Sequence, residues 1–106
     1  MIRRSFRMTL KEGKFAEYKK KHDEIWPELS NILTSIGISN YSIYFDPRDN
    51  ALIEYMELSE DNKFNQMEEF EIVKKWNIYM SDLLVTKSEK NSAPIVTELS
   101  SVFYHK

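Results

Sequence analysis

Tyr18 and His22 are the residues of this chain best suited to proton transfer. They are four positions apart, a spacing that puts two side chains on the same face of a helix. Both fall within a helical stripe of apolar residues, so neither is simply solvated. Histidine has an ordinary pKa of roughly 6.5 and can accept or donate a proton at neutral pH. The alternative is a half-buried histidine bonded to the tyrosine or to a backbone carbonyl, and the spacing alone does not decide between the two.

Three other residues have the chemistry to bind a small polar ligand. Trp76 offers a flat surface for the apolar face of a ring-shaped ligand, although a tryptophan on a helix is also a common core residue. Asn77 beside it can donate and accept hydrogen bonds to a polyol. Tyr41, in a predicted strand, is either a packing residue or a hydroxyl that points into a pocket.

The composition removes several classes of chemistry. The 106 residues include no cysteine, which excludes disulfides, thiolate nucleophiles and cysteine-ligated zinc. The two histidines, His22 and His105, share no metal-ligand spacing, so no metal site is expected. The two glycines, Gly13 and Gly37, are too few for a phosphate-binding glycine-rich loop. With 15 basic and 17 acidic residues the net charge is −2, and neither nucleic acid nor an anionic membrane is an expected partner.

The pattern of apolar residues predicts where the chain resides. The longest apolar run is three residues, so no segment is expected to span a bilayer. Residues 1–4 lead into an alternating pattern rather than an apolar stretch, which predicts no signal peptide. We therefore expect a cytoplasmic protein in which residues 1–106 form a single domain.

Hydrophobic periodicity predicts six elements of secondary structure. They are strands at 2–9, 38–46, 51–58 and 99–104 and helical segments at 13–37 and 59–85. Pro27 should kink or restart the first helical segment, and Gly37 should end it. The second segment should begin at Ser59, which can cap a helix, and should break near Phe70.

This order of elements is that of the ferredoxin-like α+β sandwich. Helices on one face of an antiparallel sheet leave the other face uncovered. We expect Phe6, Tyr41 and Phe45 to line the uncovered face. A second copy of the chain, packed sheet on sheet, would cover them, and so the sequence predicts a homodimer.

Longer motifs along the whole chain identify a resemblance. The first helical segment contains His22-x-x-Ile25-Trp26-Pro27-Glu28, and the chain resembles the L-rhamnose mutarotase family from end to end. Further matching motifs are Asn40-Tyr41-x-Ile43-Tyr44, Lys75-Trp76-x-x-Tyr79-Met80 and Glu98-Leu99-x-x-Val102-Phe103-Tyr104. The His-x-x-x-Trp-Pro-Glu run is the most specific, because small ferredoxin-like domains in general do not contain it.

The resemblance implies a dimeric α/β barrel that interconverts the α and β anomers of L-rhamnopyranose and needs no cofactor. It makes His22 the acid/base residue and places Tyr18, Tyr41 and Trp76 at sugar-contacting positions, with Asn77 beside them. Asn77 stands where the family usually has a second tryptophan, which bears on whether L-rhamnose or a related deoxy-sugar is preferred. Residues 91–94 read Asn-Ser-Ala-Pro where the family usually has Asp-Asn-Ser-Pro, in a loop expected to close the pocket.

Two other functions fit the same predicted architecture. Small monooxygenases and haem-degrading proteins also use the dimeric ferredoxin-like fold, and in such a protein His22 could be an axial haem ligand. A non-catalytic sensor domain could bind a small ligand between helix and sheet. A haem titration and a measurement of anomer exchange separate these functions from a mutarotase.

Overall fold

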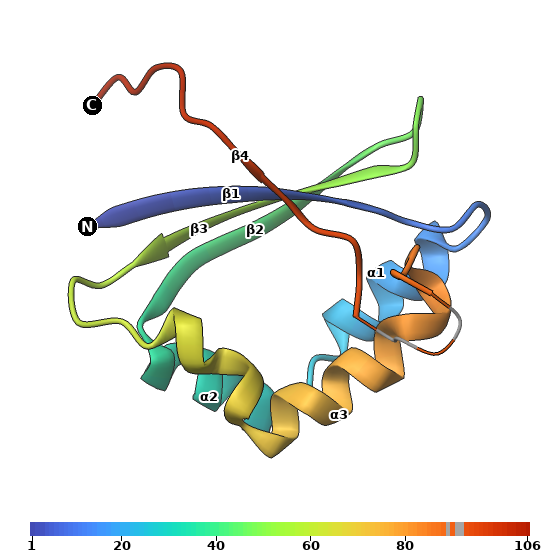
Figure 1. Ribbon diagram of the computed structural model, residues 1–106, viewed down its shortest axis with the longest axis horizontal. Coiled ribbons are helices and arrows are strands. Elements are labelled where there is room, and N and C mark those ends of the chain that lie inside the picture. Colours follow the sequence, from blue (N-terminus) through green and yellow to red (C-terminus); the bar gives the residue numbers. More distant parts are fainter. Residues whose placement is uncertain (89, 91–92) are drawn as a thin grey trace.

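The computed structural model describes residues 1–88, 90 and 93–106. A four-stranded antiparallel sheet has the strand order β2-β3-β1-β4, and the helices all lie on one of its faces (Figure 1). The elements are β1 (Ile2–Thr9), α1 (Phe15–Asp23), α2 (Pro27–Ile36), β2 (Ile38–Asp46), β3 (Ala51–Leu58), the 3-10 helix η1 (Phe64–Glu69), α3 (Glu71–Met80), the 3-10 helix η2 (Ser81–Leu83) and β4 (Thr97–Leu99). This order and pairing confirm the predicted ferredoxin-like α+β sandwich. None of the helices in the described part of the chain has the length and apolar character that crossing a bilayer requires.

The core lies between the sheet and the helices in two clusters. Alternate residues of β3 point into it, because successive side chains of a strand face opposite sides of the sheet. Leu52 belongs to the first cluster, with Leu10 and Leu83, beneath α1 and the end of α3. Leu58 belongs to the second, with Ile36 at the end of α2.

The first predicted helical segment is divided into two helices, as Pro27 requires. Trp26 has extended backbone angles (φ −63°, ψ 129°), because a residue before proline is kept out of the helical region. Proline then occupies the first turn of α2, where its missing N–H costs nothing. Gly37 ends α2 in the left-handed region at φ 102°, which confirms the predicted stop.

The predicted helix start at Ser59 is wrong. The Ser59 and Lys63 backbone N–H groups donate instead to the carbonyl oxygens of Gly37 (2.9 Å) and Ile36 (2.8 Å) at the end of α2. Regular structure resumes only at η1, and Phe70 is extended (ψ 128°) before α3, so the predicted break there is confirmed. A contact distant in sequence has overridden a local helix signal.

The uncovered face of the sheet has a different composition from the one expected. Phe6, Tyr41 and Phe45 lie on the helix-covered face, since Phe6 pairs with the buried Glu54 and Phe45 with the buried Leu52. The open face receives the other set of alternating residues, among them Arg3, Ser5, Arg7, Tyr55 and Glu57. The prediction therefore placed these three residues on the wrong one of the two faces between which the side chains of a strand alternate.

The last strand is shorter and earlier than predicted. It covers Thr97–Leu99 and pairs antiparallel with Ser5–Arg7 of β1, rather than covering 99–104. The chain after it runs past the sheet with Val102 97%, Phe103 81% and Tyr104 58% exposed (Figure 1).

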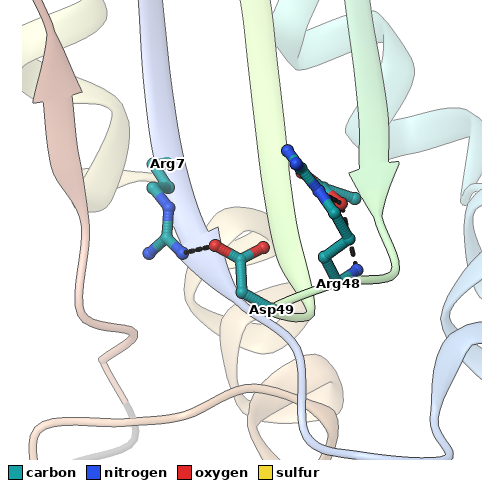
Figure 2. Close-up of polar contacts among 4 residues, drawn as sticks. Arg7, Arg48 and Asp49 are labelled. Carbon is teal, nitrogen blue, oxygen red and sulfur yellow. Dashed lines mark hydrogen bonds and ion pairs between the residues drawn. The ribbon is translucent and has the colours of Figure 1, made fainter.

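The turn between β2 and β3 is held by ion pairs. Figure 2 shows Arg7 of β1 directed at Asp49 in the turn, where Nη2 donates to Oδ2 over 2.8 Å. Arg48 folds back on Asp46 at the end of β2, also at 2.8 Å, and the pKa of the Asp46 carboxyl is lowered to about 2 chiefly by this side-chain hydrogen bond. These contacts belong to the turn that contributes Pro47 to the cavity described next.

Candidate active site

A cavity of about 800 Å³ lies between α1, α2 and the edge strand β2. Sites for small ligands typically measure roughly 300–1,000 Å³ and have apolar walls with a few polar groups. Here the apolar part of the wall includes Phe15, Leu33, Phe45 and Pro47 of the β2–β3 turn. The polar side chains that line it are Tyr18, Lys19, His22, Asp23, Tyr41 and Tyr44.

His22 is half-buried on the cavity side of α1. Its Nδ1 lies 3.1 Å from the backbone oxygen of Tyr18, one helical turn earlier. A carbonyl oxygen only accepts, so this bond assigns the ring proton to Nδ1 and leaves a lone pair on Nε2 of the neutral ring. Burial lowers the pKa of His22, and smaller effects of the Tyr18 carbonyl and Asp23 oppose it. The imidazole is therefore a neutral base at pH 7.

Aromatic rings fix the orientation of this imidazole. The Tyr18 ring lies 4.4 Å from it, centroid to centroid, and the Trp76 ring of α3 lies 5.3 Å from it at an interplanar angle of 87°. Trp76 is supported in turn by Trp26 at 5.1 Å and Tyr79 at 5.7 Å. Edge-to-face packing of this kind is favourable and directional, so His22 is held in one pose before any ligand arrives.

A β-bulge directs Tyr41 toward the helices. Ser39 pairs with Glu57 and Ser42 with Tyr55, so that Asn40 and Tyr41 together oppose a single residue of β3. Asn40 takes up the extra length in the left-handed region at φ 46°. The inserted residue shifts the alternation of β2, which brings the Tyr41 side chain to the same face as the core.

The Tyr41 hydroxyl donates to Oε2 of Glu54 over 2.5 Å. Glu54 is 9% exposed and is the one charged residue among the buried residues of the described chain. Burial raises the pKa of Glu54, and the bond from Tyr41 partly opposes that effect. The pKa of Tyr41 is raised well above its ordinary value by burial first and by Glu54 second. Tyr41 as a whole is 37% exposed and lines the cavity, so this side chain connects the cavity with the buried carboxylate.

The structure brings together three of the five predicted site residues. Tyr18, His22 and Tyr41 line one cavity, whereas Trp76 lies behind His22 and is not among the lining residues. Asn77 is also outside the lining, and its Nδ2 donates to Oε2 of Glu68 over 3.4 Å. Of the loop at 91–94, residues 91 and 92 lie outside the described residues.

Glu54 is the residue that the sequence interpretation missed. A signal for it was present, because Leu52, Glu54, Met56 and Leu58 alternate along a strand and only one of them is charged. A carboxylate among apolar residues on the buried face of a strand is rare unless it has a specific partner. The partner, Tyr41, was not visible in the sequence because the bulge that aligns it was not.

Comparison with known protein families gives a match along nearly the whole chain. A family model described as L-rhamnose mutarotase matches residues 3–105. A protein named L-rhamnose mutarotase from Tolumonas auensis is 41% identical over 104 residues, 98% of each chain. Another of the same name from Clostridium beijerinckii is 42% identical over 103 residues, 97% of each chain.

Two solved structures resemble the fold. The crystal structure of an L-rhamnose mutarotase from Formosa agariphila matches with a TM-score of 0.88 and 35% identity, covering 100% of both chains. A dimeric ferredoxin-like protein from an uncultured marine organism matches with a TM-score of 0.60 and 14% identity, covering 98% of this chain and 91% of its own. At that identity the second match concerns the fold alone.

Proposed function

Because the chain belongs to the L-rhamnose mutarotase family, we propose that it interconverts the α and β anomers of L-rhamnopyranose by opening and closing the sugar ring. The observation that carries the proposal is the family match over residues 3–105. The cavity supports it, since a mainly apolar wall with a few hydroxyl and imidazole groups suits a deoxy-sugar, which has both an apolar methyl group and several hydroxyls.

In the proposed mechanism His22 moves the proton of the anomeric hydroxyl. Its neutral Nε2 takes that proton, the oxygen keeps the electron pair and forms the C1 carbonyl, and the bond from C1 to the ring oxygen breaks. A second group protonates the ring oxygen. Rotation about the C1–C2 bond then presents the other face of the aldehyde, and reclosure reverses both proton transfers. Every proton returns to its origin, so the site is unchanged after each passage.

The other predicted site residues have distinct proposed roles. Tyr18 and Tyr41 would contact the sugar, because both line the same cavity as His22. Trp76 would hold His22, and a direct contact of its ring with the sugar stays a prediction. The predicted contact of Asn77 also stays a prediction, and it requires the amide to leave Glu68.

The proposal includes a cytoplasmic homodimer. The open face of the sheet and the exposed side chains of Phe103 and Tyr104, which line one hollow with Arg3, Ser5 and Tyr55, offer a surface that a second copy of the chain would cover. The Tyr104 ring already lies over the Arg3 guanidinium, 3.2 Å from ring centroid to Cζ, so the tail follows this face. Sedimentation equilibrium should give twice the mass of one chain, and cell fractionation tests the compartment.

Proton NMR with saturation transfer between the two anomeric signals of L-rhamnose tests the activity. The exchange rate should increase in proportion to the protein added. His22→Gln should reduce the protein-dependent rate by roughly 10²- to 10⁴-fold, the usual contribution of a general acid or base. His105→Gln is the matched control, because His105 is the only other histidine and is exposed near the chain end. Exchange in His22→Gln equal to that of the control would remove His22 from the mechanism.

A further inference from the structure

Glu54 is a buried carboxylate beside the cavity to which the mechanism above gives no task. It lies in the middle of β3, and its cross-strand neighbours Phe6 and Ile43 are both apolar. Among the described residues, no lysine, arginine or histidine forms an ion pair with it. A carboxylate buried without a cation is unfavourable, and an apolar residue would fill the same place at less cost. Packing therefore does not explain this residue.

The only hydrogen bond of the Glu54 side chain within the described structure leads to the cavity. Its donor is the Tyr41 hydroxyl, and Tyr41 lines the cavity together with Tyr18 and His22. The bulge at Asn40 turns Tyr41 toward Glu54, so a local irregularity of the backbone serves this contact. A phenol that touches both a buried carboxylate and a ligand cavity can pass a proton between them.

We propose that Glu54 acts through the Tyr41 hydroxyl as the second proton-carrying arm of the site, the partner of His22. This inference rests on the proposed mutarotase function. Glu54 is a positioning residue in this scheme, because it does not line the cavity and reaches the sugar only through Tyr41.

The proton transfers balance when one proton is shared between the two arms. With that proton on Glu54, the hydrogen bond runs from the carboxyl to the Tyr41 oxygen, the reverse of its direction to the ionised carboxylate. Nε2 of His22 then accepts the anomeric proton, Tyr41 gives its hydroxyl proton to the ring oxygen, and Glu54 passes its carboxyl proton to the Tyr41 oxygen. Tyr41 is neutral before and after, His22 becomes cationic and Glu54 anionic. Reclosure on the other face of the aldehyde returns each proton along the same path. A mutarotase needs this reversibility, because each arm must act as acid in one direction and as base in the other.

The local electrostatics favour such sharing. Burial raises the pKa of Glu54 and lowers that of His22, which narrows the difference in proton affinity between the two groups. The titratable groups that face Glu54 are Tyr41 from β2 and Tyr18 from α1, and His22 is influenced by Asp23 and the Tyr18 carbonyl of its own helix. The rate should fall at low pH, where both arms are protonated, and at high pH, where both have lost their protons.

The test is the pH profile of saturation-transfer exchange in L-rhamnose for four proteins. Wild type should give a bell-shaped profile. Glu54→Gln should lower the maximal protein-dependent rate by roughly 10- to 100-fold. Its pH profile should keep only the fall in rate at low pH that protonation of His22 causes. Tyr41→Phe should lower the rate similarly, and the double variant should be no slower than the slower single variant, since both residues belong to one arm. Glu60→Gln, an exposed glutamate after β3, is the matched control and should keep both limbs.

The possible outcomes distinguish the role of Glu54 from the mutarotase activity itself. A Glu54→Gln protein with a bell-shaped profile and a rate within about two-fold of the control would overturn the role of Glu54 while leaving the mutarotase activity established. Additive losses in the double variant would also overturn it, because two independent sites would then be at work. A wild-type protein that does not accelerate exchange, measured beside the spontaneous rate, would refute the proposed function and this inference together.

Discussion

Removal of the Tyr41 hydroxyl should destabilise the fold in a way that depends on pH. In Tyr41→Phe the Glu54 carboxylate, 9% exposed, loses the hydrogen bond from Tyr41 but stays in the same apolar surroundings. Hydrogen bonds to charged groups typically contribute about 1.5–3 kcal/mol. Where Glu54 is ionised, the free energy of unfolding should therefore fall by about 1.5–3 kcal/mol, a large part of the stability of a domain this small.

The sign of the pH dependence follows from the pKa of Glu54. Burial raises this pKa in the folded chain, and the Tyr41 bond opposes the rise, so its removal raises the value further. A carboxyl group whose pKa is higher in the folded than in the unfolded state favours folding when it is protonated. That stability is lost as the pH rises from the ordinary value of glutamate through the raised folded value. The cost of Tyr41→Phe should thus be full where Glu54 is ionised and should shrink as Glu54 becomes protonated on acidification.

Urea denaturation at about pH 5, close to the ordinary pKa of glutamate, and at alkaline pH, where Glu54 is ionised, measures both quantities. Tyr44→Phe is the matched control, since Tyr44 lies on the same strand and is 69% exposed, and it should change stability by less than about 0.5 kcal/mol. Comparison of each variant with wild type at the same pH cancels the other titrating groups, such as Asp46. Equal costs for the two variants, or a Tyr41→Phe cost that does not change with pH, would refute the reasoning.

Two further predictions concern the end of α2 and the aromatic cluster behind His22. Gly37→Ala should cost about 2–4 kcal/mol of unfolding free energy in urea denaturation, because φ is 102° and a Cβ would lie only 3.2 Å from the backbone Cα of Asn62, besides displacing the Ser59 hydroxyl. Gly13→Ala, at φ 78° with open space around it, should cost only about 1 kcal/mol, and equal losses would show that the crowding at Gly37 does not matter. Trp76→Phe should cost about 1 kcal/mol and should lower kcat more than it raises KM in exchange kinetics, because the ring orients His22; a raised KM with unchanged kcat would instead make Trp76 a direct sugar contact.

Much of the fold could be predicted because its signals are local. Pro27 and Gly37 determine the limits of α2 through backbone conformation alone, and both positions were predicted correctly. The start at Ser59 failed because its backbone N–H binds the Gly37 carbonyl, a contact between segments that no local pattern reveals. The last strand was misplaced for a similar reason: its position depends on pairing with Ser5–Arg7 at the other end of the chain.

The candidate site shows the same division. Tyr18 and His22 are one helical turn apart, so their proximity is encoded in the spacing. Tyr41 was assigned to the open face, where strict alternation from Ile38 would also place it, and no sequence signal marks the extra residue at Asn40 that moves it to the other face. The same bulge concealed the role of Glu54, because its partner Tyr41 lies on the same face of the sheet only when the bulge is present.

The aromatic cluster behind His22 allows intrinsic tryptophan fluorescence to report on the site. The chain has two tryptophans, Trp26 and Trp76, and their rings lie 5.1 Å apart in that cluster. All of the intrinsic tryptophan emission therefore originates beside the imidazole, with no background from elsewhere in the chain. A change in the charge of His22, or the arrival of a sugar against it, changes the surroundings of Trp76 directly. Ligand occupancy and the ionisation of the base can thus be followed in the unlabelled protein, even with a sugar that binds without being turned over.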